Sequence, residues 1–99
     1  MINLRFLPAD ARHIVIDSVA DLAEGHWASL AAGVLGARAV AETADLIHDK
    51  IVANKDLTDN DLVYVMDALD ASETNCIELD MPTAAAEYYD ARQYVVNLF

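Results

Sequence analysis

A long apolar stripe with helical spacing, in the first third of the chain, constrains the fold most strongly. Apolar residues recur there at steps of three and four: Ile16, Ala20, Ala23, Trp27, Leu30 and Val34. Such steps place side chains on one face of an α-helix. We therefore expect a helix over about Ala9–Ala32 with Pro8 at its start, and Gly25 marks the point where this helix could bend or split.

Two glycines, Gly33 and Gly36, predict a helix C-cap and a turn after this stripe. A second helix is expected over about Ala37–Ala53, where apolar residues again follow helical steps. Many of its positions are alanines, and small side chains would let it approach a neighbouring helix closely.

The start of a third helix is the sharpest local prediction. Thr58 fits an N-cap, and the acids of 59–61 would lie where the helix dipole is positive. Leu57 and Leu62 occupy the two positions of a hydrophobic staple. This helix is expected to continue to about Ala71.

A short β ribbon is an optional addition. Ser72–Asn75 is expected to form a loop, after which Cys76–Met81 alternates between apolar and polar residues. Ile2–Phe6 alternates in the same way, as a short strand would. If the two segments pair, Arg5 would lie near Glu78 or Asp80.

The expected fold class is mainly α: one domain over residues 1–99, built as a small bundle of about four helices. The fourth helix would run from Pro82 to about Asn97. Its last stretch, Gln93–Phe99, is rich enough in β-branched and aromatic residues to be helix or strand.

The balance of charge is as unusual as the helical pattern. The chain has 17 Asp and Glu against six Lys and Arg, a net charge of -11 over 99 residues. Direct binding of nucleic acid is disfavoured, because it needs Lys and Arg to neutralise phosphates. An anionic membrane surface would repel the chain, and no apolar run approaches the ~20 residues that span a bilayer. With a single cysteine, Cys76, and no secretory signal pattern, a cytoplasmic location is expected.

No metal, cofactor or catalytic residue is predicted. Asp56, Thr58, Asn60 and Asp67 match four positions of a calcium-binding loop, but Asp61 stands where that loop needs glycine.

The histidines and the cysteine lead to the same expectation. His13 and His48 have acids nearby on their helices, yet the chain lacks the ligands of a structural zinc site. Cys76 has acidic neighbours, which do not activate a thiol, and Glu78 with Asp80 is a common surface pattern. We expect a protein that is not an enzyme.

Acidic residues at helical steps are the candidate partner-binding residues. They are Asp17, Asp21, Glu24, Asp45, Asp49, Asp67 and Asp70. Like charges at such steps weaken a helix by a few tenths of a kcal/mol per pair, which leaves their presence to be explained. The stripes either keep the protein in solution or imitate the charge of DNA, which carries a negative charge every ~1.7 Å.

The expected function is therefore binding to a basic protein surface, in particular to a nucleic-acid-binding protein, which it would inhibit or mask. A small acidic helical chain without catalytic residues resembles, in general terms, the inhibitors that bacteriophages make against host defences. These include anti-CRISPR proteins and DNA mimics. The alternative is a homo-oligomer, or a module that sequesters a small ligand, through an apolar aromatic surface.

Overall fold

Four α-helices account for most of the chain in the computed structural model, which describes residues 2–98. They are α1 (Ala9–Ala31), α2 (Ala37–Val52), α3 (Asp59–Glu78) and α4 (Pro82–Val96), and the 3-10 helix η1 (Leu4–Phe6) precedes them. The expectation of a mainly α fold with about four helices is confirmed.

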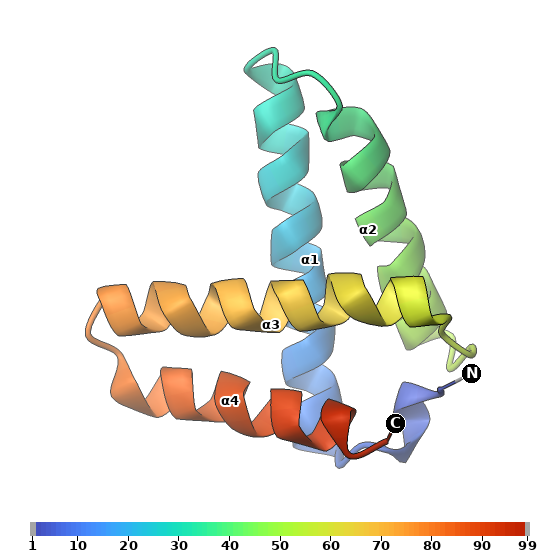
Figure 1. Cartoon of the computed structure of the whole chain (residues 1–99), viewed down its shortest axis with the longest axis vertical. Coiled ribbons are helices and arrows are strands. Elements are labelled where there is room, and N and C mark those ends of the chain that lie inside the picture. The colour runs from blue at the N-terminus through green and yellow to red at the C-terminus, as the bar shows by residue number, and fades with distance from the viewer. Residues whose placement is uncertain (1, 99) are drawn as a thin grey trace.

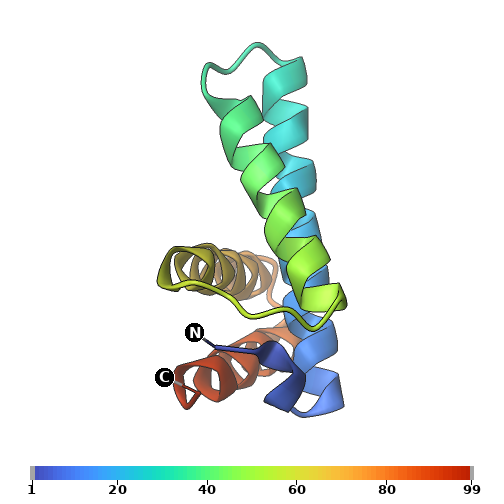
Figure 2. The same ribbon diagram turned by 90° about the vertical axis from the view of Figure 1, so that its right-hand side faces the viewer.

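The helices form two antiparallel hairpins that cross each other. Figure 1 shows α3 and α4 lying across the N-terminal half of α1, and Figure 2 shows that they cover one face of the α1–α2 hairpin. The far halves of α1 and α2 extend beyond α3 as an arm. Each hairpin forms one layer, and the molecule measures 17 Å along its shortest axis, against 37 and 34 Å along the others.

The hydrophobic core lies where the two hairpins cross. Val15, Val19, Ile47, Leu69 and Val95 are among its fully buried side chains, and they come from all four helices. Farther out along the arm, the buried residues are small. They include Ala23, Ala37, Ala41 and Ala44. In the arm, α1 and α2 therefore pack through buried alanines, as the small side chains of 37–53 predicted.

The same type of cap closes α1, α2 and α3. Gly33, Asn54 and Asp80 each adopt a positive φ just after the helix. In each case the next N–H bonds back into the helix: Val34 to Ser29 at 3.0 Å, Lys55 to Lys50 at 2.8 Å and Met81 to Cys76 at 2.8 Å. These are Schellman motifs, so the predicted C-cap at Gly33 is confirmed.

The predicted start of α3 is also confirmed. The Asp61 backbone N–H donates to the Thr58 hydroxyl at 3.1 Å, and the Thr58 N–H donates to the Asp61 carboxylate at 3.0 Å. This reciprocal pair is a capping box. Leu57 and Leu62 are both buried, as the two ends of a hydrophobic staple are.

The predicted end of α3 is wrong. The helix continues through Ser72–Asn75, which was expected to be a loop, and reaches Glu78. Ser72 faces α1, where its hydroxyl forms a hydrogen bond with that of Ser18. This bond allows a polar residue to occupy a position of α3 that faces another helix. Cys76, one turn later, is buried on the same face.

The optional ribbon of Ile2–Phe6 with Cys76–Met81 is likewise wrong. Within residues 2–98, the β pairing is an isolated bridge between Ile2 and Leu57, and most of Cys76–Met81 belongs to α3 and its cap. Arg5 does not lie near Glu78 or Asp80. The N-terminal segment and the α3–α4 turn are at opposite sides of the molecule (Figure 1).

Two further expectations concern helix continuity. α1 neither splits nor ends at Gly25, because a glycine without close neighbours is tolerated inside a helix. The stretch Gln93–Phe99 could have been helix or strand. Its residues up to Val96 belong to α4, and Phe99 lies outside the described residues.

Candidate functional site

The seven acids that the sequence marks for partner binding are exposed and lie on three helices. α1 carries Asp17, Asp21 and Glu24, α2 carries Asp45 and Asp49, and α3 carries Asp67 and Asp70. Asp67 follows the buried Val65 by two residues, or about 200° of helical turn, so it points away from α1. The seven residues therefore do not form one continuous surface.

Three of the seven have contacts within the chain. Asp45 accepts a hydrogen bond from the Trp27 indole at 2.8 Å, which links α1 to α2. Trp27 is only half-buried, so it is less enclosed than a core residue. Asp70 accepts a 2.9 Å hydrogen bond from Arg92. Asp49 lies 3.6 Å from the imidazole of His48. The contacts of Asp45 and Asp70 link different helices, so these two acids have a structural role.

A coherent acidic surface forms instead where α1 meets α4. Asp10 of α1 and Glu87 and Asp90 of α4 line one hollow, of about 440 Å³. Asp17 and Asp21 continue this surface along α1. Asp17 lies seven residues after Asp10, and Asp21 lies four residues after Asp17, so all three share one face of the helix. Glu24 follows three residues later. We call this surface the acidic edge; its members are Asp10, Asp17, Asp21, Glu24, Glu87 and Asp90.

Tyr88 lies near acids of both helices. Burial raises the pKa of its phenol above the ordinary value, and the nearby ionisable groups of Cys76, Asp21, Asp17 and Glu87 raise it further. Carboxylates from α1 and α4 thus act on one side chain between the two helices.

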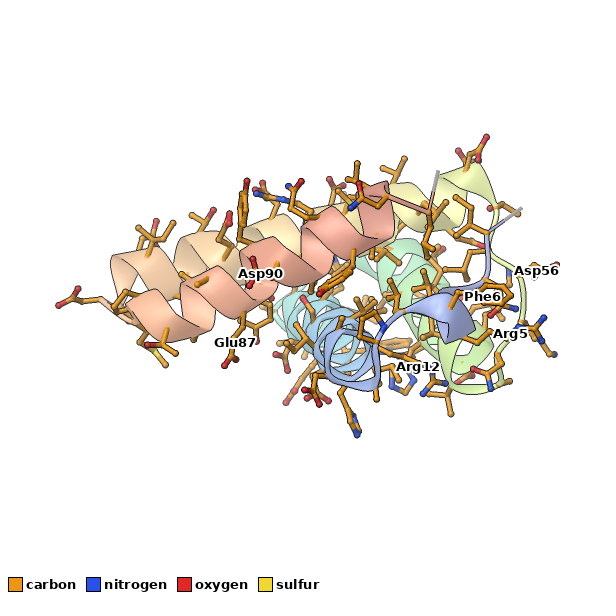
Figure 3. All side chains as sticks on the ribbon, turned by 90° about the horizontal axis from the view of Figure 1, so that it is seen from below. Arg5, Phe6, Arg12, Asp56, Glu87 and Asp90 are labelled. Atoms are coloured by element: carbon orange, nitrogen blue, oxygen red, sulfur yellow. The ribbon has the colours of Figure 1, made fainter. Side chains whose placement is uncertain are left out.

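The positive charges lie elsewhere. Arg12 donates to the Ile51 carbonyl at 2.9 Å and to the Asn54 side chain at 2.9 Å, at the end of α2. Lys50 bonds to the Asp61 carboxylate at 2.9 Å. Arg5 is in η1, beside that region. Figure 3, which looks along α1, shows Arg5 and Arg12 on one side of the helix and Glu87 and Asp90 on the other.

Lys55 lies in the segment between α2 and α3, and the other two cations contact acids outside the edge. Arg92 faces α3, where it bonds to Glu73 at 3.0 Å as well as to Asp70. Arg38 lies 4.0 Å from Glu42 on α2, in an exposed pair. Within residues 2–98, no Lys or Arg forms an ion pair with a member of the acidic edge. The edge therefore keeps its negative charge.

Sequence reasoning did not include Asp10 among the partner-binding residues, and it missed Glu87 and Asp90. Their three-residue spacing on a helix is visible in the sequence, but it is too common to single them out. Only the packing of α4 beside α1 brings them next to Asp10 and Asp17.

The described residues offer no cluster of three or more His, Cys, Asp or Glu arranged for a metal ion. The residues of the calcium-loop pattern are separated, because Asn60 and Asp67 lie inside α3 and Thr58 caps it. Along residues 2–98, every helix is too short or too polar to cross a membrane.

Comparison with known proteins adds no relative. The chain matches no protein-family model, no curated protein and no solved structure.

Proposed function

We propose that this protein is a non-enzymatic binding protein whose acidic edge occupies a basic surface of a nucleic-acid-handling partner and so inhibits or masks that partner. The observation that carries the proposal is a group of carboxylates without a cationic partner. Six carboxylates gather along α1 and α4, and within residues 2–98 none of them forms an ion pair with Lys or Arg. Arg12 and Lys50 bond instead to groups at the end of α2 and the start of α3.

A rigid row of carboxylates is suited to imitate a nucleic acid. Asp10 and Glu24 are 14 residues apart on α1, so the row on that helix spans about 21 Å at about 1.5 Å per residue. Over a similar length, duplex DNA presents a negative charge every ~1.7 Å. The edge is less dense in charge than DNA, but α4 adds Glu87 and Asp90 at the end of the row where it crosses α1.

The electrostatics favour fast capture of a cationic cleft. Complementary potentials steer association and raise its rate, and salt screens them over a Debye length of about 10 Å at 0.1 M. Phage inhibitors of host defence systems, including anti-CRISPR proteins and DNA mimics, are the class to which this proposal assigns the protein.

The proposal is tested by capture from a bacterial lysate on the immobilised protein at about 50 mM salt, well below the ionic strength that screens such contacts. We expect a retained nucleic-acid-binding protein that duplex DNA releases, because DNA and the acidic edge would share one site. A retained protein that duplex DNA and high salt both fail to release would contradict the proposal.

Self-association is a second candidate, favoured by exposed apolar side chains at the two outer ends of the molecule. At the tip of the arm, Leu35 is 97% exposed and Val34 52%. At the α3–α4 turn, Ile77 is 64% exposed and Leu79 62%. Light scattering at high salt, where repulsion between acidic copies is screened, would show a mass well above 10.8 kDa if this candidate holds.

A further inference from the structure

α1 carries a small residue at each point where another helix crosses it. At Ala11, which is buried, α1 meets α4, and Ala11 lines the same hollow as Ala91. Seven residues later, α3 crosses at Ser18, whose hydroxyl lies 2.7 Å from that of Ser72. Seven residues later again comes Gly25, which is exposed. Gly25 shares a groove with α3, and the far half of α1 extends beyond that helix (Figure 1).

The spacing is that of neighbouring helices in one layer. Seven residues rise about 10.5 Å along a helix, and packed helices are about 8–10 Å apart. A helix placed beside α3, in the layer of α3 and α4, would therefore cross α1 at Gly25. Figure 2 shows that the arm extends far enough beyond α3 to leave this face of α1 uncovered.

A groove exists at this position. It has a volume of about 340 Å³ between α1 and α3, and its lining includes Asp21, Leu22, Gly25, Ala71 and Asn75. We call it the notch. A Cβ at Gly25 would meet no atom within 4 Å, so the packing of this chain does not require glycine there. Glycine inside a helix nevertheless destabilises it relative to alanine.

The negative charge near the notch favours a basic occupant over an acidic one. Asp21 belongs both to the notch and to the acidic edge, and no Lys or Arg is among the lining residues of the described chain. A second copy would bring its own net charge of -11 and be repelled. A helix with positive charges on one side would be attracted instead.

We propose that the notch receives an amphipathic helix of the basic partner, which lies beside α3 as a third helix of that layer. Small or apolar side chains of this helix would pack on Gly25 and Leu22, and its Lys and Arg would face Asp21 and the acidic edge. This inference rests on the proposed function, since it names the element by which the basic partner is held.

The test uses a synthetic peptide of about 18 residues, or about five helical turns, with alanine and leucine on one face and lysine and arginine on the other. Binding is measured by fluorescence anisotropy. Gly25→Leu should weaken it by about tenfold, because the new side chain fills the notch. Ala31→Leu adds the same bulk to an exposed position of α1 outside the notch and should leave binding unchanged.

Folding is checked by thermal unfolding, in which Gly25→Leu should not lower the midpoint, since leucine is a better helix former than glycine. The NMR amide shifts of Leu22 and Ala71 should change on addition of the peptide. Unchanged binding by Gly25→Leu, or peptide-induced shifts that avoid these residues, would overturn the inference. So would a dimer of this protein that Gly25→Leu disrupts, because a second copy would then occupy the notch.

The two proposals fail in different ways. If the triple variant Asp17→Asn, Asp21→Asn and Glu87→Gln weakens peptide binding while Gly25→Leu does not, the acidic edge stands and the notch is refuted. If the triple variant binds as tightly as the parent protein, the proposed function itself is contradicted. Charge would then no longer support a basic helix as the occupant of the notch.

Discussion

The hydroxyl groups of Ser18 and Ser72 lie 2.7 Å apart where α3 crosses α1. Ser18 is 1% exposed and Ser72 is half-buried, so at least the Ser18 hydroxyl has little access to water. One hydroxyl donates to the other, so each has a hydrogen-bond partner, which reduces the penalty of burying either one alone. The small side chains also let the two helices approach closely at the crossing.

Removal of one hydroxyl should destabilise the protein more than removal of both. Ser18→Ala leaves the Ser72 hydroxyl without its partner, and we expect a loss of about 1–2 kcal/mol in the free energy of unfolding. The double variant Ser18→Ala with Ser72→Ala should regain much of it. A double-mutant cycle by urea denaturation measures this coupling. Additive single effects would show that the two hydroxyls do not stabilise each other.

Asp61 should make stability depend on acid pH. Burial alone would raise the pKa of its carboxyl, but the hydrogen bond from the Thr58 backbone and the hydrogen bond and charge of Lys50 outweigh burial, so the pKa lies below 3.8. A lowered pKa in the folded state stabilises the protein above the unfolded pKa. This contribution is lost as the pH falls from about 3.8 through the folded pKa.

Asp61→Asn should therefore destabilise the protein by about 1–2 kcal/mol at neutral pH, where the capping box and the Lys50 ion pair are intact. The difference from the parent protein should narrow at about pH 3. Chemical denaturation of both proteins at the two pH values checks this. A difference that stays constant with pH would mean that the ionised carboxylate contributes nothing.

Gly25 and Gly33 should respond to alanine with opposite signs. Gly25 is helical with open space around it, so Gly25→Ala should raise stability by about 1 kcal/mol. Gly33 has φ +87°, which is unfavourable for alanine, so Gly33→Ala should lower stability by about 1–2 kcal/mol. Thermal unfolding followed by circular dichroism measures both. A stabilising Gly33→Ala would refute the left-handed cap at the end of α1.

Local signals in the sequence predicted the helix starts and turns well. Thr58, Leu57 and Leu62 determine the beginning of α3 through contacts within a few residues, and Gly33 determines the end of α1 in the same way. The end of α3 could not be predicted, because Ser72 looks like a loop residue until its partner Ser18 is known. The alternation after Cys76 imitated a strand, although only Cys76 on that segment faces the core.

The candidate site was predictable only along α1. The steps from Asp17 to Asp21 and Glu24 follow from helical geometry alone. The α2 and α3 acids had the same spacing, but the fold turns Asp67 away from α1 and gives Asp45 and Asp70 partners within the chain. The contribution of Glu87 and Asp90 depends on how α4 packs, which no local pattern in the sequence encodes.

The proposed function depends on where the acids lie, not on the net charge of the whole protein. Two triple variants separate the effect of position from that of net charge, because both change the net charge from -11 to -8. The edge variant combines Asp17→Asn, Asp21→Asn and Glu87→Gln. The control variant combines Asp59→Asn, Glu78→Gln and Asp80→Asn, which are exposed acids outside the acidic edge.

The decisive measurement is the amount of DNA-releasable protein that each immobilised variant captures from the same bacterial lysate at low salt. We predict that the edge variant loses most of the captured protein, about tenfold or more, while the control variant captures as much as the parent protein. Equal losses in the two variants would show that net charge alone governs binding. Equal retention would show that the acidic edge does not bind the partner, and either result would contradict the proposed function.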